Sequence, residues 1–203
     1  MAIISVPAKF SFTDISRFAL QRASNILRSR YTGQSQRIVF PFAIWQLEGT
    51  LVDYDGAEAA AIRSFYAQLD GVKNTFRLPV PGYTKPSTGY IANRAVSIAA
   101  AARATSLTVS GGTPNAPYIG NGEYFMVQDE LKLTTAPVAF NGAGQATINF
   151  KPALRKAVAV GVNVIVLNPT ILMHATDDDV ANWPLKPPYR HGFNFSAIEA
   201  IEI

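Results

Sequence analysis

The sequence predicts a mainly β protein with one prominent helix, of the α+β class. Three observations lead to this prediction. Short segments with continuous or alternating apolar residues recur along most of the chain. Only residues 55–71 combine a helical apolar stripe with a start and a stop signal. Three prolines and two glycines between residues 79 and 89 separate two regions of different composition.

The composition is that of a folded chain with few charges. Of 203 residues, 48% are hydrophobic and 16% are charged, the opposite of the balance in disordered chains. The absence of cysteine excludes disulfides and thiolate metal sites. The first twelve residues do not have the pattern of a secretory signal, and no apolar run reaches the roughly 20 residues that span a bilayer. We therefore expect synthesis in the cytoplasm and no membrane insertion.

The net charge of +4 lies within the first 50 residues. In this segment only Asp14 and Glu48 are acidic, and the basic residues are Lys9, Arg17, Arg22, Arg28, Arg30 and Arg37. A basic segment can contact nucleic acid or an acidic protein surface. No recognition-helix or zinc-finger pattern accompanies the charge, which favours a polar strand face or a protein interface.

Residues 14–30 fit two structures. Their apolar residues have helical spacing, with Thr13 as a possible N-cap, but they also fit an extended strand that ends at Arg30. In the extended alternative, residues 31–34 form a turn in which Gly33 takes positive φ, and residues 37–42 return. Pro41 would place this return strand at a sheet edge or a bulge. Residues 44–52, which include Trp45, alternate like a half-buried strand.

Residues 55–71 predict the helix. Asp55 and Glu58 have the spacing of a capping box. Asp70 and Gly71 follow as a stop signal. The expected core stripe recurs at helical spacing and consists of Ile62, Phe65, Tyr66 and Leu69. Trp45 and Phe76, in the flanking strands, are expected to join the same core.

The second half predicts a small antiparallel barrel or sandwich. Short strands are expected at residues 106–110, 123–128, 130–134, 146–150 and 162–167. Near the C-terminus, Phe193 and Phe195 share one face of a further strand, which we expect to return to the first domain. The predicted organisation is therefore a domain of residues 1–85 completed by residues 170–203, with residues 86–169 inserted.

No residue pattern predicts catalysis, a cofactor or a metal. His174 and residues 177–179 read as a solvated turn, because the ligand spacing of a calcium loop is missing. The two G-x-G segments, residues 120–122 and 142–144, read as hairpin turns. The adjacent carboxylates at 129–130 point to opposite faces of a strand and so cannot act as an acid/base pair. We predict that the chain is not an enzyme.

The order of elements resembles that of minor tail proteins of long-tailed (siphovirus-like) bacteriophages, and most closely that of distal tail proteins. The resemblance spans roughly residues 25–200. Glu123 stands where these proteins usually have aspartate. The segments that carry the resemblance are RSRYTGQSQR (28–37), AIWQLEGTL (43–51), AAAIRSFYAQLDGVKNTFRL (59–78), NGEYFMVQDELKLTT (121–135) and FKPALRKAVAVGVNV (150–164).

This resemblance implies a structural virion protein of the tail tip, in a hexameric ring that joins the tail tube to the receptor-binding apparatus. Residues 1–85 and 170–203 would form the ring as a β belt, and residues 86–169 would project. The implied partners are copies of the chain, the tube and tape-measure proteins, and tail-tip hub or receptor-binding proteins. DNA would pass through the channel without specific binding. The resemblance also favours the extended form of residues 14–30.

We expect Arg28, Arg30 and Arg37 to lie at a subunit interface. One alternative is another minor tail or tube-completion protein. A second is a carbohydrate-binding module of the tail tip, in which Tyr118, Tyr124 and Phe125 would contact a glycan.

Overall fold

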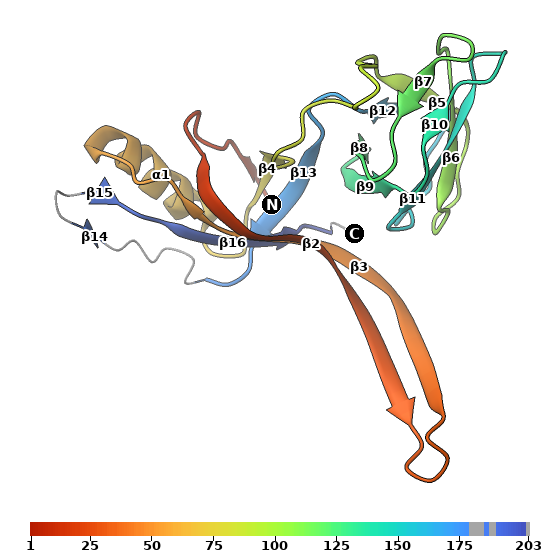
Figure 1. Ribbon diagram of the computed structural model, residues 1–203. Coiled ribbons are helices and arrows are strands. Elements are labelled where there is room, and N and C mark those ends of the chain that lie inside the picture. Colours follow the sequence, from red (N-terminus) through yellow and green to blue (C-terminus); the bar gives the residue numbers. More distant parts are fainter. Residues whose placement is uncertain (179–184, 187–189, 202–203) are drawn as a thin grey trace. The chain divides into compact units, whose positions relative to one another are not determined.

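The computed structural model describes residues 1–178, 185–186 and 190–201, and the chain divides into two compact units (Figure 1). Unit 1 consists of Met1–Phe76 and Met173–Ile203, and unit 2 of Arg77–Leu172. Both ends of the chain therefore build unit 1. The sequence predicts the same order of parts, with boundaries after residues 85 and 169.

Unit 1 is a six-stranded sheet in the order β1-β4-β13-β16-β3-β2. Strands β1 and β4 are parallel, whereas β13, β16, β3 and β2 pair antiparallel in that order. The bounds are β1 (Ile3–Ile4), β2 (Phe12–Arg28), β3 (Ser35–Leu51), β4 (Thr75–Pro79), β13 (Thr170–Ala175) and β16 (Asn194–Glu199). The two-stranded ribbon of β14 (Leu185–Lys186) and β15 (Arg190–His191) completes the described part.

Residues 14–28 are extended, and Arg30 belongs to the turn that follows. Strand β2 pairs with β3 from Phe12↔Leu51 to Arg28↔Ser35, and Gly33 in the turn has φ +70°. The register shifts between Arg22↔Ala43 and Ser24↔Val39. Pro41 therefore lies in a bulge, where its missing N–H is tolerated. Cross-strand pairing decides between the two structures that the local pattern allows.

Helix α1 (Gly56–Leu69) packs on one face of this sheet. All four residues of the predicted stripe are buried. Phe65 contacts Phe76 edge to face at 5.6 Å, and Tyr66 contacts Phe195 at 5.7 Å. Phe193 and Phe195 are both buried on the α1 side. The predicted aromatic core is confirmed.

The ends of α1 agree with the prediction only in part. Asp70 and Gly71 both have positive φ, 52° and 66°, and end the helix as expected. Asp55 occupies the N-cap position with extended backbone, but its side chain makes no capping hydrogen bond. Glu58 instead binds Lys9. The predicted capping box is wrong. Lys9, which is distant in sequence, binds the Glu58 carboxylate that a capping box requires.

Unit 2 is a closed six-stranded barrel in the order β11-β6-β5-β12-β8-β9, which resolves the choice between barrel and sandwich. Its core is apolar. The strands are β5 (Arg94–Ile98), β6 (Ser106–Ser110), β8 (Tyr124–Val127), β9 (Glu130–Thr134), β11 (Ala146–Lys151) and β12 (Asn163–Ile165). A separate ribbon contains β7 (Pro117–Ile119) and β10 (Val138–Ala139). Gly122 and Gly144 have positive φ in the two predicted turns.

A buried ion pair fixes one wall of the barrel. Lys132, fully buried on β9, contacts the carboxylate of Glu130 at 2.6 Å. Lys132 also donates to the carbonyl of Ala153 at 2.9 Å, and Glu130 accepts N–H groups of Arg155 and Lys156 at 3.0 and 3.2 Å. The pair thereby holds the segment after β11 against the barrel. These hydrogen bonds offset the cost of burying both charges.

A second carboxylate fastens the proline-rich segment to the barrel. Glu123 accepts the N–H of Ser87 at 2.6 Å and that of Gly120 at 2.7 Å. Its own N–H donates to the Thr134 hydroxyl at 2.9 Å. The added methylene of glutamate, compared with aspartate, extends the reach of the carboxylate toward Ser87.

Replacement of Phe65 by alanine should destabilise unit 1 by about 3–5 kcal/mol, because it leaves a cavity in the aromatic core. The matched control is Phe40→Ala, at a side chain that is 49% exposed and should cost less than ~0.5 kcal/mol. Urea unfolding followed by tryptophan fluorescence measures both. Equal losses would contradict the proposed position of the core.

Replacing one partner of the Glu130–Lys132 pair should destabilise unit 2 more than replacing both. Lys132→Met should cost about 3–5 kcal/mol because Glu130 stays buried without its cation. The second single variant is Glu130→Gln. The double variant Glu130→Gln/Lys132→Met should lose clearly less stability than the two single variants lose together. Thermal unfolding monitored by circular dichroism provides the cycle. Additive losses would show that the two side chains act independently.

Candidate assembly surface

The outer half of the β2–β3 ladder forms a two-stranded ribbon that extends beyond the rest of the sheet (Figure 1). We call residues 24–40 the arm. Every side chain in the arm is exposed. Strand β16 pairs with β3 only at residues 46–50, so among the described residues the arm strands pair only with each other. Such a ribbon is marginal in water unless something packs on it.

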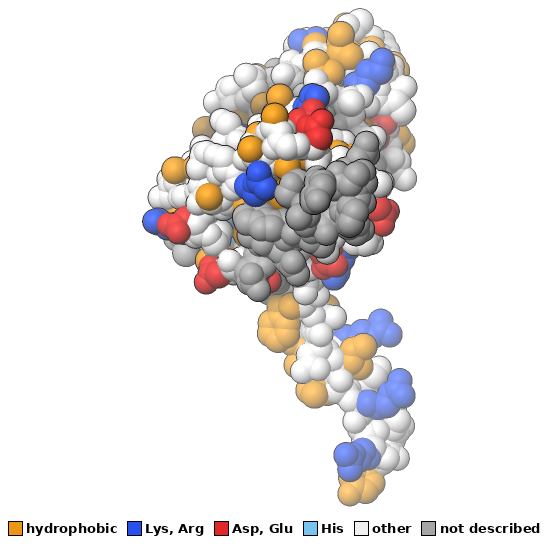
Figure 2. Space-filling view, turned by 90° about the vertical axis from the view of Figure 1, so that its left-hand side faces the viewer, with side chains coloured by type: hydrophobic (Ala, Val, Ile, Leu, Met, Phe, Trp, Pro, Cys, Tyr) orange, Lys and Arg blue, Asp and Glu red, His pale blue; other side chains and the backbone are white. Residues whose placement is uncertain are grey.

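The arm exposes an unusual amount of apolar surface. Tyr31 is 100% exposed, Val39 71% and Ile26 60%, and Leu27, Phe40 and Ile38 are also exposed. Figure 2 shows hydrophobic and basic side chains interspersed along the projecting ribbon. Exposed apolar side chains gathered on one two-stranded ribbon make the arm a candidate interaction surface.

The arm is also cationic. Between Asp14 and Glu48 the sequence contains five arginines and no acidic residue. Outside this stretch, 13 basic residues face 14 acidic ones, so the stretch carries more than the whole net charge. Arg28, Arg30 and Arg37 belong to the arm, and in the described part of the chain none of them forms an ion pair. The arm therefore combines apolar side chains with unpaired hydrogen-bond donors.

The cross-strand register distributes these groups over two faces. Residues directly opposite each other in an antiparallel pair share a face. One face carries the pairs Ile26↔Arg37 and Arg28↔Ser35, followed by Ser24↔Val39, and the other carries Asn25↔Ile38 and Leu27↔Gln36. One face of the ribbon thus presents two arginines together with two aliphatic side chains.

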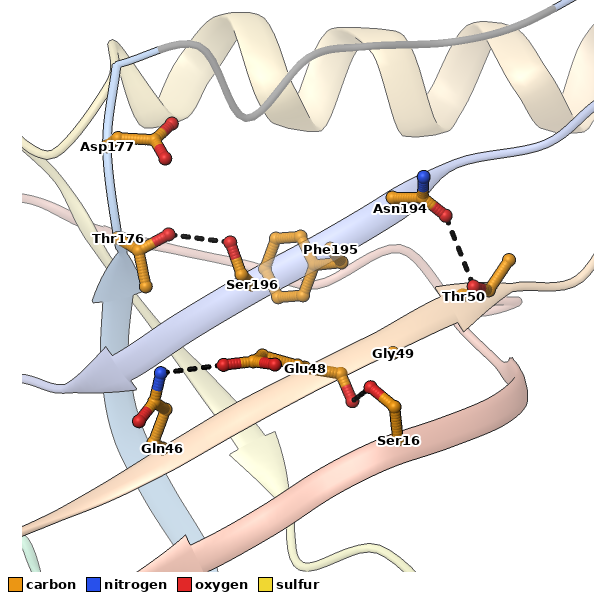
Figure 3. A pocket seen from close by; sticks show the side chains of 10 residues that line it. All are labelled: Ser16, Gln46, Glu48, Gly49, Thr50, Thr176, Asp177, Asn194, Phe195 and Ser196. Atoms are coloured by element: carbon orange, nitrogen blue, oxygen red, sulfur yellow. Dashed lines mark hydrogen bonds between the residues drawn. The ribbon is translucent and has the colours of Figure 1, made fainter. Parts of the chain in front are cut away.

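A polar pocket lies on the unit 1 sheet, lined by residues of β2, β3 and β16 and by Thr176 and Asp177 (Figure 3). It has a volume of about 490 Å³. Glu48 accepts a hydrogen bond from Gln46 Nε2 at 2.8 Å, and the Thr176 and Ser196 hydroxyls are 2.6 Å apart. The lining residues are Ser16, Gln46, Glu48, Gly49, Thr50, Thr176, Asp177, Asn194, Phe195 and Ser196.

Two carboxylate side chains, those of Glu48 and Asp177, line this pocket. Gln46 Nε2 donates to Glu48, and Gln46 Oε1 is buried without a hydrogen-bond partner among the described residues. Arg17 Nη1 lies 3.5 Å from Glu48 Oε1, and both side chains are about 40% exposed, at 43% and 40%, so this ion pair is weak. An incoming donor would find in Glu48 a carboxylate with remaining acceptor capacity.

The structure does not support the predicted glycan contacts. Tyr118 and Phe125 are both 0% exposed in the barrel core, and burial raises the pKa of the Tyr118 hydroxyl. Tyr124 is half-buried and packs edge to face on Tyr83 at 5.5 Å. Closing a small barrel requires large side chains inside it, and these rings supply that volume. They are therefore not available as a surface platform.

His174 is likewise not in a solvated turn. It lies on β13, half-buried, with Nδ1 2.7 Å from the Ala175 carbonyl. Asp178 follows the strand and accepts the N–H of Val72 at 3.2 Å, whereas Asp179 lies outside the described residues. Over residues 1–178, 185–186 and 190–201, no group of side chains is arranged to hold a metal, and no helix has the length and apolarity to span a membrane.

No protein-family model matches the chain, and no curated protein matches it. The function is therefore inferred from the geometry of this chain and from the resemblance of its motifs.

Shortening the arm should leave unit 1 folded. In the test variant, Asn-Gly replaces residues 25–38 and joins Ser24 to Val39 through a tight turn. Because the arm contributes no buried side chain, the thermal unfolding midpoint should stay close to that of the full chain. Loss of cooperative unfolding would show that the arm belongs to the core.

Proposed function

We propose that this chain is a structural subunit of the tail tip of a long-tailed bacteriophage. In this role it assembles with copies of itself into a ring that joins the tail tube to the receptor-binding apparatus. The observation that carries the proposal is the arm, an exposed apolar and cationic ribbon on an otherwise well-packed sheet. A ribbon of this kind is an aggregation hazard in a free monomer and a contact surface in an assembly.

The arm suits a heterologous contact, in which it meets a different surface of the neighbouring copy. Contacts of this type close into a ring when the rotation between copies allows it. The resemblance to distal tail proteins supplies the expected number of copies, six. Unit 2 would be the projecting part, and its buried aromatic and ionic groups serve its own stability. The expected partners are the tube, tape-measure, hub and receptor-binding proteins.

Charge reversal on the arm should abolish assembly. Wild-type protein should give one closed oligomer by native mass spectrometry, and Arg28→Glu/Arg30→Glu/Arg37→Glu should give monomers, because the reversed charges repel the surface that receives the arm. High salt should weaken the wild-type oligomer.

The matched control reverses three basic residues of unit 2, Arg103, Lys151 and Lys156, and should assemble like wild type. A monomeric wild-type protein, or an arm variant that assembles normally, would overturn the proposed function.

A further inference from the structure

We propose that the polar pocket of one copy receives arginine side chains from the arm of a second copy. This inference rests on the proposed function and names the partner surface of the arm. The pocket would be one half of every subunit contact, and the arm face with Arg28 and Arg37 the other half.

The chemistry of the two surfaces is complementary. A guanidinium group offers five N–H donors and no acceptor. The pocket offers the carboxylate of Glu48, whose side chain is 40% exposed. Arg28 and Arg37 have no carboxylate partner among the described residues. Docking would pair these two arginines with the exposed carboxylate of Glu48.

The arm of a chain cannot reach its own pocket. Glu48 and Arg37 lie on the same strand, β3, eleven residues apart. At about 3.3 Å per residue, this separation is roughly 36 Å along a continuous ladder. The contact is therefore possible only between copies. Because arm and pocket are different surfaces, each copy can give one contact and receive one, as a ring requires.

The apolar part of the arm has a place in the same contact. Ile26 and Val39 share the face of Arg28 and Arg37. When the guanidinium groups enter the pocket, these side chains come against the receiving sheet and leave water. Their burial supplies the hydrophobic contribution, and the arginines determine where the arm lands.

Two single-surface variants test this pairing. The arm variant is Arg28→Gln/Arg37→Gln, whose neutral side chains cannot pair with the reversed charge of the pocket variant, Glu48→Lys. Each should be monomeric alone in native mass spectrometry. Mixed in equal amounts, they should form heterodimers and nothing larger, because the pocket variant keeps an intact arm and the arm variant keeps an intact pocket.

Controls separate folding from assembly. Circular dichroism should show that Glu48→Lys is folded, and the milder Glu48→Gln should weaken assembly about tenfold or more. Asp53→Lys makes the same charge change at an exposed carboxylate outside the pocket and should assemble like wild type.

The outcomes distinguish the two proposals. Monomeric wild-type protein would overturn the proposed function and this inference together. Wild-type oligomers with unchanged assembly of both Glu48 variants would overturn this inference alone, and would mean that the arm docks elsewhere. Failure of the mixture to form heterodimers would also overturn it.

Discussion

The ladder between β2 and β3 is the constraint on which the rest of unit 1 depends. It is antiparallel from Phe12↔Leu51 to Arg28↔Ser35, with register shifts at three places. In its inner half, β16 pairs with β3 and α1 covers one face, so that Trp45 and Leu47 are buried. In its outer half the same pairing continues without a third strand. The pairs from Ser24↔Val39 to Arg28↔Ser35 fix the face on which each arm side chain lies.

The bulge around Pro41 separates these two halves. Proline cannot donate to the ladder, and bulges bend and twist a strand pair. The shift between Arg22↔Ala43 and Ser24↔Val39 lies where the sheet gives way to the arm. A ribbon held in register loses less conformational entropy on binding than a free loop does, which favours its use as a contact surface.

Sequence patterns predict much of the fold but less of the surfaces. The strand at 106–110, the end of α1 at Asp70 and the aromatic core around Phe65 follow from local signals. The sequence does not distinguish a helix from a strand at residues 14–30, because their apolar spacing fits both. Pairing with β3 determines that residues 14–28 form a strand. The hydrogen bonds from Lys132 to Ala153, from Arg155 to Glu130 and from Ser87 to Glu123 join segments more than 20 residues apart, so no local pattern encodes them.

The candidate site shows the same division. The sequence groups Arg28, Arg30 and Arg37 as an interface, but not their exposure on an arm, which depends on where β16 ends. The pocket needs Thr176 and Ser196 beside Glu48, a meeting of three strand regions that a linear pattern cannot show. The glycan contact predicted at Tyr118 fails for a related reason. The sequence around an aromatic residue on a short strand does not show which face of the strand points into the core.

Cysteine cross-linking tests the contact between arm and pocket most directly, because the chain contains no cysteine of its own. Ser35 is the cross-strand partner of Arg28 on the same face of the arm, and Ser16 lines the pocket. The double variant is Ser35→Cys/Ser16→Cys. Within one chain the ladder keeps these positions roughly 40 Å apart, whereas a disulfide needs Cα atoms within about 7 Å. Under oxidation the double variant should give a ladder of covalent oligomers that ends at the ring size, and neither single variant should pass the dimer. A double variant that stays monomeric on a non-reducing gel while the native protein is oligomeric would contradict the account.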